Sequence, residues 1–128
     1  MQMRRCDHAA VRVPGHGIFA IGGWNEAGSY EDVELLQLIG DDEDATLWWQ
    51  MTPMLQPKKE PSACYFGGFV FVCSSDSSYL DLERFDVEAG ATGQWTRITY
   101  QFSSDFRRNL LSLKGSLWVI GDLNAPSI

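Results

Sequence analysis

One type of apolar segment occurs three times in this chain at nearly constant spacing. The copies begin at Ile18, Val70 and Leu117, so successive copies lie 52 and 47 residues apart. A repeat of about 50 residues constrains the fold more than any local pattern, because each unit must bury its apolar face against a neighbouring unit. The sequence therefore predicts a series of stacked supersecondary units.

Other features recur in step with these segments. A short apolar stretch precedes each copy, and an acidic and apolar stretch follows the first two copies, at 32–36 and 81–86. A tryptophan then closes each complete unit, Trp49 in the first and Trp95 in the second. The stretches are rich in β-branched and aromatic residues and are bounded by Gly, Pro, Ser or Asp, which favours strands. The best helical candidate, 30–38, is also expected to be a strand because of its place in the repeat.

The first unit contains four segments whose order and content match a known repeat. They are His8-Ala9-Ala10-Val11, Ile18-Phe19-Ala20-Ile21-Gly22-Gly23, Val33-Glu34-Leu35-Leu36 and Trp49-Gln50-Met51-Thr52-Pro53-Met54. In this order they resemble one complete kelch repeat. The second unit has Ser74-Ser75 where the family has two glycines, and the third stops after its second strand. A double glycine after an apolar strand permits positive φ and a close approach of neighbouring backbone.

This resemblance implies an all-β chain, a partial kelch β-propeller built from four-stranded antiparallel blades. Residues 1–128 would form a single incomplete kelch-repeat region, with repeat 1 at about 5–56, repeat 2 at about 57–104 and a partial repeat 3 at about 105–122. The chain then holds two full blades and half of a third, whereas propellers typically need four to eight blades to close. We expect either a fragment of a longer protein or an open stack whose end faces are covered by self-association or by partners.

Composition restricts the classes of partner and the compartment. Ten Lys and Arg against seventeen Asp and Glu give a net charge of −7, which disfavours nucleic-acid binding. The longest apolar run, 67–73, is too short to span a membrane, and no apolar region behind the basic N-terminus predicts export. Three cysteines without a Cys-x-x-Cys motif fit a reducing compartment. We therefore predict a cytoplasmic chain with no nucleic-acid or membrane partner.

Residues typical of catalysis are scarce. The chain has two histidines, no zinc-ligand spacing, no phosphate-binding glycine loop and no nucleophile elbow. Cys64 and Tyr65 point to opposite faces of a regular strand, which argues against a copper oxidase site of the kind some kelch-type propellers have. The acidic run 41–44 is expected to be a solvated loop. We predict no catalytic residue, metal or cofactor, and no enzyme activity. An alternative is a fragment of a kelch-like oxidase or isomerase whose active site lies in missing blades.

Binding candidates come from two kinds of segment. Basic doublets precede the three expected innermost strands; they are Arg4-Arg5, Lys58-Lys59 and Arg107-Arg108. In a propeller, equivalent positions of successive blades converge at one end of the central channel. They would form a basic rim for carboxylates, unless they are isolated solvated charges. The loops at 24–30 and 76–79 are rich in Gly, Ser and Asn, and kelch resemblance implies that they share this face. The partner-binding candidates are Arg5, Asn25, Ser29, Tyr30, Lys58, Lys59, Ser77, Tyr79, Arg107 and Arg108.

These observations predict a protein–protein interaction module of kelch type with a protein or peptide partner, acidic if the basic rim exists. The segment 49–54 resembles a stretch frequent in kelch-like proteins with a BTB domain, which implies substrate recognition for a cullin-type ubiquitin ligase. Cytoskeletal binding is a variant within the same class. A self-assembling structural half-propeller is the remaining alternative.

Overall fold

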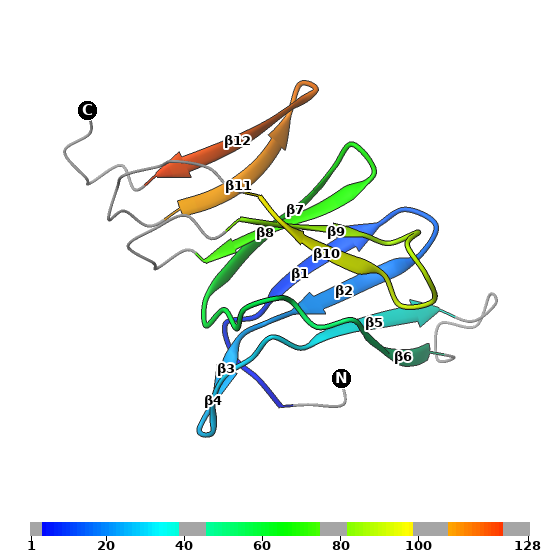
Figure 1. The fold of residues 1–128 in the computed structure, drawn as a ribbon, viewed down its shortest axis with the longest axis vertical. Coiled ribbons are helices and arrows are strands. Elements are labelled where there is room, and N and C mark those ends of the chain that lie inside the picture. The colour runs from blue at the N-terminus through cyan, green and yellow to red at the C-terminus, as the bar shows by residue number, and fades with distance from the viewer. Residues whose placement is uncertain (1–3, 39–45, 75–81, 99–107, 122–128) are drawn as a thin grey trace.

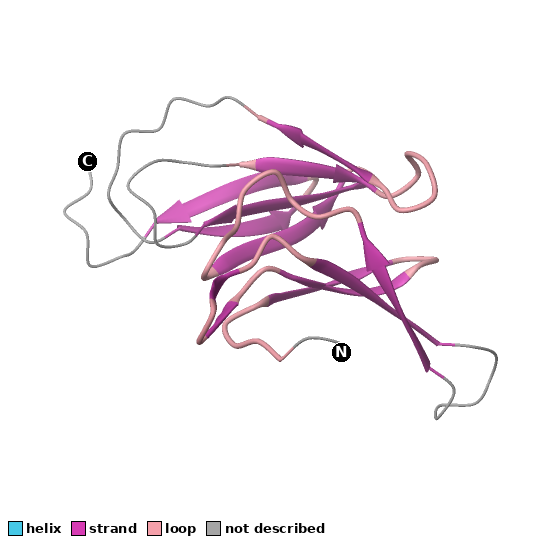
Figure 2. Cartoon of the chain, turned by 60° about the horizontal axis from the view of Figure 1, so that its bottom comes forward, coloured by secondary structure: helices cyan, strands magenta, loops and turns pink. Residues whose placement is uncertain are grey.

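The structure, a computed structural model, describes residues 4–38, 46–74, 82–98 and 108–121. These parts consist of strands joined by turns and loops, without a helix (Figure 2). The stretch 30–38, the best helical candidate of the sequence, contains a strand as predicted. No described segment is a helix long and apolar enough to cross a membrane.

The first repeat forms one four-stranded antiparallel sheet with the order β1-β2-β5-β6 (Figure 1). A small hairpin, β3 with β4, lies in the connection between β2 and β5. The bounds of these strands are β1 Ala9–Val13, β2 Gly17–Ile21, β3 Trp24–Asn25, β4 Gly28–Ser29, β5 Val33–Leu38 and β6 Thr46–Met51.

The second repeat forms a sheet of the same kind. Its strands follow one another across the sheet in chain order, from β7 through β8 and β9 to β10. The third repeat contributes the antiparallel hairpin β11–β12. The described chain is therefore all-β, with two four-stranded antiparallel sheets, as the repeat predicts, and two two-stranded ones, β11–β12 and the small β3–β4 hairpin. The bounds are β7 Pro61–Phe66, β8 Phe69–Ser74, β9 Glu83–Asp86, β10 Gln94–Arg97, β11 Arg108–Leu113 and β12 Ser116–Gly121.

The main core lies between the two four-stranded sheets. Alternate residues of a strand share one face, so the first sheet buries Phe19 and Ile21 while the second buries Val70 and Phe85. The Phe85 ring lies 5.7 Å from that of Phe19 and 4.7 Å from that of Trp95. Burial of each such large apolar side chain contributes about 1.5–3 kcal/mol. The facing sheets are thus held together mainly by apolar packing.

A second, smaller core covers the other face of the second sheet. Cys73 and Leu82 pack there against Leu110 of β11, with Phe71 and Val119 beside them. The first strands of the three sheets, β1, β7 and β11, lie next to one another (Figure 1). Successive repeats therefore stack face to face, and the second sheet is covered on both sides.

The strand register corrects the expected equivalence of the closing tryptophans. Trp95 lies opposite Phe85, and the position in the first sheet that corresponds to Phe85 is Leu36, which lies opposite Trp48. Trp48 is therefore the counterpart of Trp95. Trp95 is only 5% exposed, whereas Trp49 is 50% exposed. Adjacent residues of a strand point to opposite faces, so the sequence comparison was wrong by one position.

The double glycine of the first repeat has the predicted backbone. Gly22 and Gly23 adopt φ of 65° and 95°. A Cβ atom on Gly23 would lie 2.6 Å from the carbonyl oxygen of Cys6. The backbone N–H of Gly23 donates a 2.9 Å hydrogen bond to the carbonyl oxygen of Lys58. The glycines thus allow the N-terminal segment and the connector between the sheets to approach the end of β2.

Candidate partner-binding site

Three segments meet at the end of the first sheet where β2 ends. They are the N-terminal segment, the β3–β4 hairpin and the connector between β6 and β7. Cys6 and Trp24 exchange two backbone hydrogen bonds of 2.9 and 3.1 Å, which tie the N-terminal segment to the β3–β4 hairpin. The backbone N–H of Lys58 donates to the carbonyl oxygen of Tyr30 at 3.0 Å, which ties the connector between β6 and β7 to the same place. We call this region the loop end. The structure thus brings together the 24–30 loop and the basic segments that contain Arg5 and Lys58.

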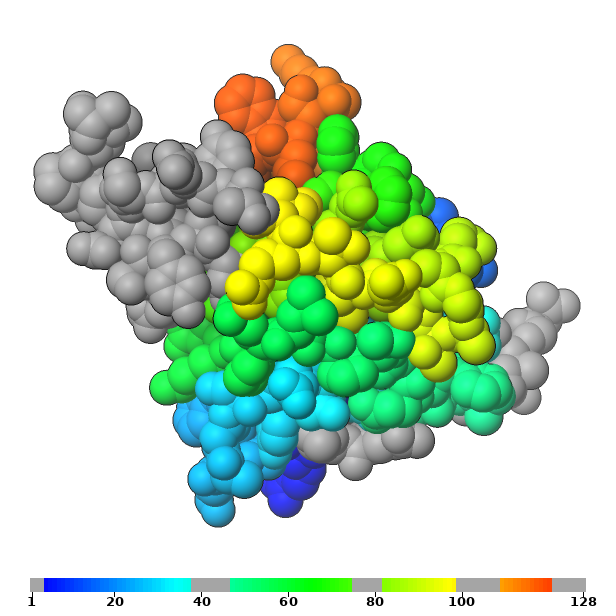
Figure 3. Space-filling view, in the orientation of Figure 1, coloured from blue at the N-terminus to red at the C-terminus, as the bar shows by residue number. Residues whose placement is uncertain are grey.

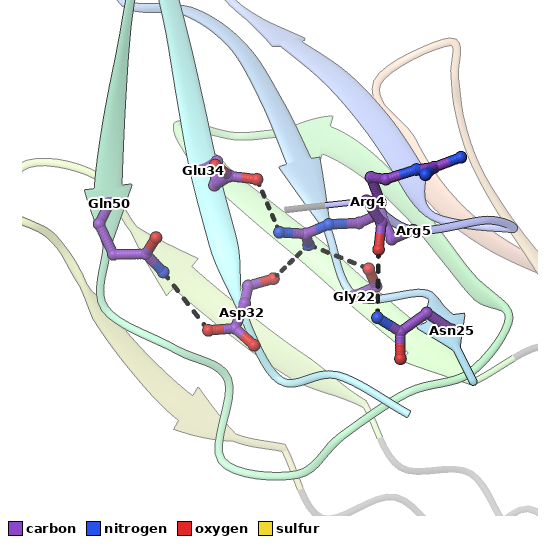
Figure 4. A network of polar contacts seen from close by, with 7 residues as sticks. All are labelled: Arg4, Arg5, Gly22, Asn25, Asp32, Glu34 and Gln50. Atoms are coloured by element: carbon purple, nitrogen blue, oxygen red, sulfur yellow. Dashed lines mark hydrogen bonds and ion pairs between the residues drawn. The ribbon is translucent and has the colours of Figure 1, made fainter. Parts of the chain in front are cut away.

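Arg5 is inside this region rather than on its rim. Its Nη2 donates to Oε2 of Glu34 at 2.7 Å, and both side chains are fully buried. Nη1 donates to the carbonyl oxygens of Gly22 and Asp32, each at 3.0 Å (Figure 4). Such charge-assisted bonds are among the stronger hydrogen bonds in proteins. Arg5 therefore fixes the entry to the first sheet.

Lys58 has the corresponding role in the second sheet. Its Nζ lies 2.6 Å from Oε2 of Glu83, and both side chains are buried. The other carboxylate oxygen of Glu83 accepts a 2.7 Å hydrogen bond from the backbone N–H of Leu55. Glu34 and Glu83 occupy equivalent positions, opposite corresponding residues of β2 and β8. The basic positions do repeat from sheet to sheet, but Arg5 and Lys58 face carboxylates of their own sheet, so we do not retain them as contact residues.

A hollow of about 530 Å³ opens at the loop end. The amide of Asn25 shapes its wall, because Nδ2 donates to the carbonyl oxygen of Arg4 at 3.4 Å (Figure 4) and Oδ1 accepts from the N–H of Ala27 at 2.7 Å. Asn25 thus holds the tip of the β3–β4 hairpin against the N-terminal segment. The hollow is lined by Arg4, Arg5, Cys6, Trp24, Asn25 and Glu26.

Trp24 is the large aromatic group of this hollow, and its orientation is fixed from two sides. Its Nε1 donates to Oδ2 of Asp7 at 2.8 Å. The Nζ of Lys59 lies 4.9 Å from the indole centroid, a cation–π contact worth about 0.5–1 kcal/mol at an exposed site. The side chain remains partly exposed. A rigid, half-buried indole offers a large contact area with little loss of side-chain entropy on binding.

The charges around Trp24 are mixed. Arg4 and Lys59 are exposed cations, but the exposed carboxylates of Asp7 and Glu26 lie at the same end. With Arg5 already paired in the interior, the described part of the loop end is not the basic rim that the sequence predicted. It is a polar surface of mixed charge, with Lys59 over the ring of Trp24 and Arg4 in the lining of the same hollow.

The other candidates lie near the β3–β4 hairpin, at the start of β11, or outside the described residues. Asn25 and Ser29 lie on the β3–β4 hairpin, and Tyr30 follows it with its ring 5.7 Å from the guanidinium carbon of Arg5. Arg108 begins β11, where its backbone pairs with that of Gly121. Ser77, Tyr79 and Arg107 lie outside the described residues, as does the acidic run at 41–44. The sequence reasoning missed Trp24 and Arg4 as lining residues, although both adjoin named candidates.

A second hollow of about 370 Å³ lies at the opposite end of the strands. Leu35, Trp49 and Val87 contribute apolar surface to it. Nε2 of His16 lies 2.8 Å from Oε1 of Glu88, which links the β1–β2 turn to the loop before β10. Trp48 and Trp49 are neighbours on β6, so their side chains point to opposite faces of the sheet. These adjacent tryptophans were a sequence signal for the second hollow, because one of them had to lie on the face where the hollow opens.

The thiols do not suggest a reactive centre. Cys6, Cys64 and Cys73 are not joined in disulfides, and Cys73 is buried in the smaller core. Burial raises the pKa of the Cys64 thiol, which lowers the fraction of nucleophilic thiolate at neutral pH. Within the described ranges, no three His, Cys, Asp or Glu side chains are grouped to hold a metal ion. The arrangement at the loop end is suited to non-covalent recognition.

No family model matches the chain, and no curated protein shows significant similarity to it.

Proposed function

We propose that this chain is a protein-recognition module of kelch type that binds a protein or peptide partner at the loop end. The observation that carries the proposal is the Trp24 indole, which is held by Asp7 and Lys59 and remains partly open to solvent in a 530 Å³ hollow. Tryptophan and arginine dominate binding energy at many interfaces because they combine large contact area with directed polar groups.

The charges beside Trp24 define the chemistry of the partner. Arg4 and Lys59 can receive one carboxylate, whereas Glu26 would repel a strongly acidic segment. Asp7 already accepts the indole N–H. The partner segment is therefore an apolar or aromatic side chain with a single neighbouring carboxylate, rather than a run of acidic residues.

The wider role that we propose is substrate recognition for a cullin-type ubiquitin ligase, with cytoskeletal binding as its variant. The support is the resemblance of 49–54 to the corresponding stretch of BTB-containing kelch proteins, together with two sheets of the same strand order. We place this activity in the cytoplasm because the three cysteines form no disulfide, as is usual in a reducing compartment.

A random peptide display library selected on the immobilised chain tests the binding proposal. Enriched peptides, measured by fluorescence polarisation, should bind Trp24→Ala at least about tenfold more weakly, equivalent to 1.4 kcal/mol, because the aromatic contact is lost. Arg4→Glu should weaken only those peptides that carry a carboxylate.

The matched control is Trp49→Ala, which removes a half-exposed tryptophan from the hollow at the other end of the sheet. It should leave the peptide affinity unchanged. Peptides that bind Trp24→Ala and the unaltered chain equally well would overturn the proposal.

A further inference from the structure

The β11–β12 hairpin exposes a continuous apolar face. Trp118 is 53% exposed and lies opposite Leu111, which is also exposed. Leu113 and Ile120 occupy alternate positions on the same two strands, so all four side chains share one side of the hairpin. We call these four residues the hairpin face. Figure 3 shows the hairpin, in orange, at one extremity of the molecule.

The repeat indicates what covers such a face. In the alignment of the repeats, Trp118 corresponds to Phe19 and Ile120 corresponds to Ile21. The strand register agrees with this alignment, because Phe19 lies opposite Val11 of β1 as Trp118 lies opposite Leu111 of β11. Phe19 and Ile21 are fully buried, and the side chains that cover them come from the second sheet. The hairpin face is therefore a repeat of a surface that, in the first sheet, is covered by the second sheet.

The covering surface also occurs twice in the chain. In the second sheet, Val70, Phe85 and Trp95 lie in register across β8, β9 and β10 and pack on the first sheet. The corresponding positions of the first sheet lie on its other side, where no described segment of equivalent size covers them. They are Ile18, Leu36 and Trp48, with Ala10 in the position of Ala63.

We call Ala10, Ile18, Leu36 and Trp48 the back face. Ile18 is 44% exposed, and Leu36 and Trp48 are partly exposed. Arg12, which lies opposite Ile18, is the exposed charge among these positions, and its aliphatic stem can cover apolar surface while the guanidinium stays in water. Each copy of the chain thus carries one surface of each kind.

We propose that copies of this chain associate head to tail, the back face of one copy packing on the hairpin face of the next. The contact repeats the packing of the second sheet on the first and is independent of the loop end. Because the two surfaces differ, each added copy leaves one of each surface open, and association continues beyond a dimer. The hairpin has two strands where the first sheet has four, so this contact is smaller than the one between the four-stranded sheets.

Light scattering at increasing protein concentration tests this proposal with two charge variants, Trp118→Glu on the hairpin face and Ile18→Glu on the back face. The unaltered chain should increase in mass from 14.4 kDa with concentration and pass that of a dimer. Each variant alone should remain a monomer. An equimolar mixture of the two variants should stop at a dimer, because it contains one intact pair of faces.

Leu47→Glu is the matched control, since Leu47 is an exposed apolar residue that belongs to neither face. It should associate like the unaltered chain. Circular dichroism checks that the variants remain folded, and Ile120→Lys replaces Trp118→Glu if the latter unfolds. An unaltered chain that stays at 14.4 kDa, or a variant mixture that stays monomeric while the unaltered chain associates, would overturn the proposal.

Discussion

Replacing one member of the buried Lys58–Glu83 pair should destabilise the chain far more than replacing the neighbouring lysine. At 2.6 Å the two charges attract by about 6 kcal/mol for an effective dielectric constant of about 20. Desolvation of the ions offsets much of this gain, so the intact pair contributes little net stability. Removal of one partner alone leaves a buried charge uncompensated, and we expect a loss of about 3–5 kcal/mol in the free energy of unfolding.

Urea denaturation monitored by tryptophan fluorescence measures this loss for Lys58→Met, Glu83→Gln and the double variant. The glutamine of the second variant still offers an oxygen to the Leu55 N–H. The double variant has no unpaired buried charge, so its loss should be smaller than the sum of the single losses by at least about 2 kcal/mol. Lys59→Met, an exposed control, should change stability by less than about 0.5 kcal/mol.

Two results of the urea denaturation would argue against a buried ion pair between Lys58 and Glu83. Equal urea midpoints for Lys58→Met and Lys59→Met would show that Lys58 is solvated and would restore it as a candidate for partner contact. Additive losses in the double variant would show that Lys58 and Glu83 do not interact.

The remaining predictions concern packing, backbone and thiol chemistry. Trp95→Ala should lower the free energy of unfolding by about 3–5 kcal/mol, while Trp49→Ala should cost less than about 1 kcal/mol; equal losses in urea denaturation would contradict the register. Gly23→Ala should destabilise more than Gly67→Ala in the same assay, since both have positive φ but only Gly23 has a carbonyl oxygen where the Cβ would lie. Cys64 should be alkylated by iodoacetamide more slowly at pH 9.0 in the folded chain than in urea, because burial raises the pKa of its thiol above the ordinary value of 9.0. The thiol of the unfolded chain then ionises first, so this group lowers the stability of the fold as the pH rises above 9.0. Equal alkylation rates would argue against burial of Cys64.

The repeat predicted most of the sheet architecture because it records strand positions directly. The spacing of Ile18, Val70 and Leu117 located β2, β8 and β12, and the sheets have the strand order expected from chain order. The equivalence of the tryptophans was wrong by one residue, because Trp48 and Trp49 are adjacent and the sequence does not show which of them faces the core. Only the cross-strand register decides this.

The loop end was predicted in position but not in chemistry. The sequence placed Arg5 and Lys58 near the start of each sheet, and the structure confirms this position. It could not show that glutamates of β5 and β9 would meet them, because these partners are 29 and 25 residues away and depend on the register of the third strand. Trp24 lies in the 24–30 loop that the sequence singled out, but it was not among the named contact residues because its role depends on contacts with two other segments, through Asp7 and Lys59.

We propose that a partner binds at the loop end, around Trp24. The most direct test is an amide and indole NMR titration of the ¹⁵N-labelled chain with a peptide selected on the unaltered chain. We expect the resonances of the Trp24 indole N–H and the Lys59 amide to shift with peptide concentration, while that of the Trp49 indole N–H does not. Shifts confined to Trp49 and the neighbouring Glu88, with Trp24 unchanged, would contradict it.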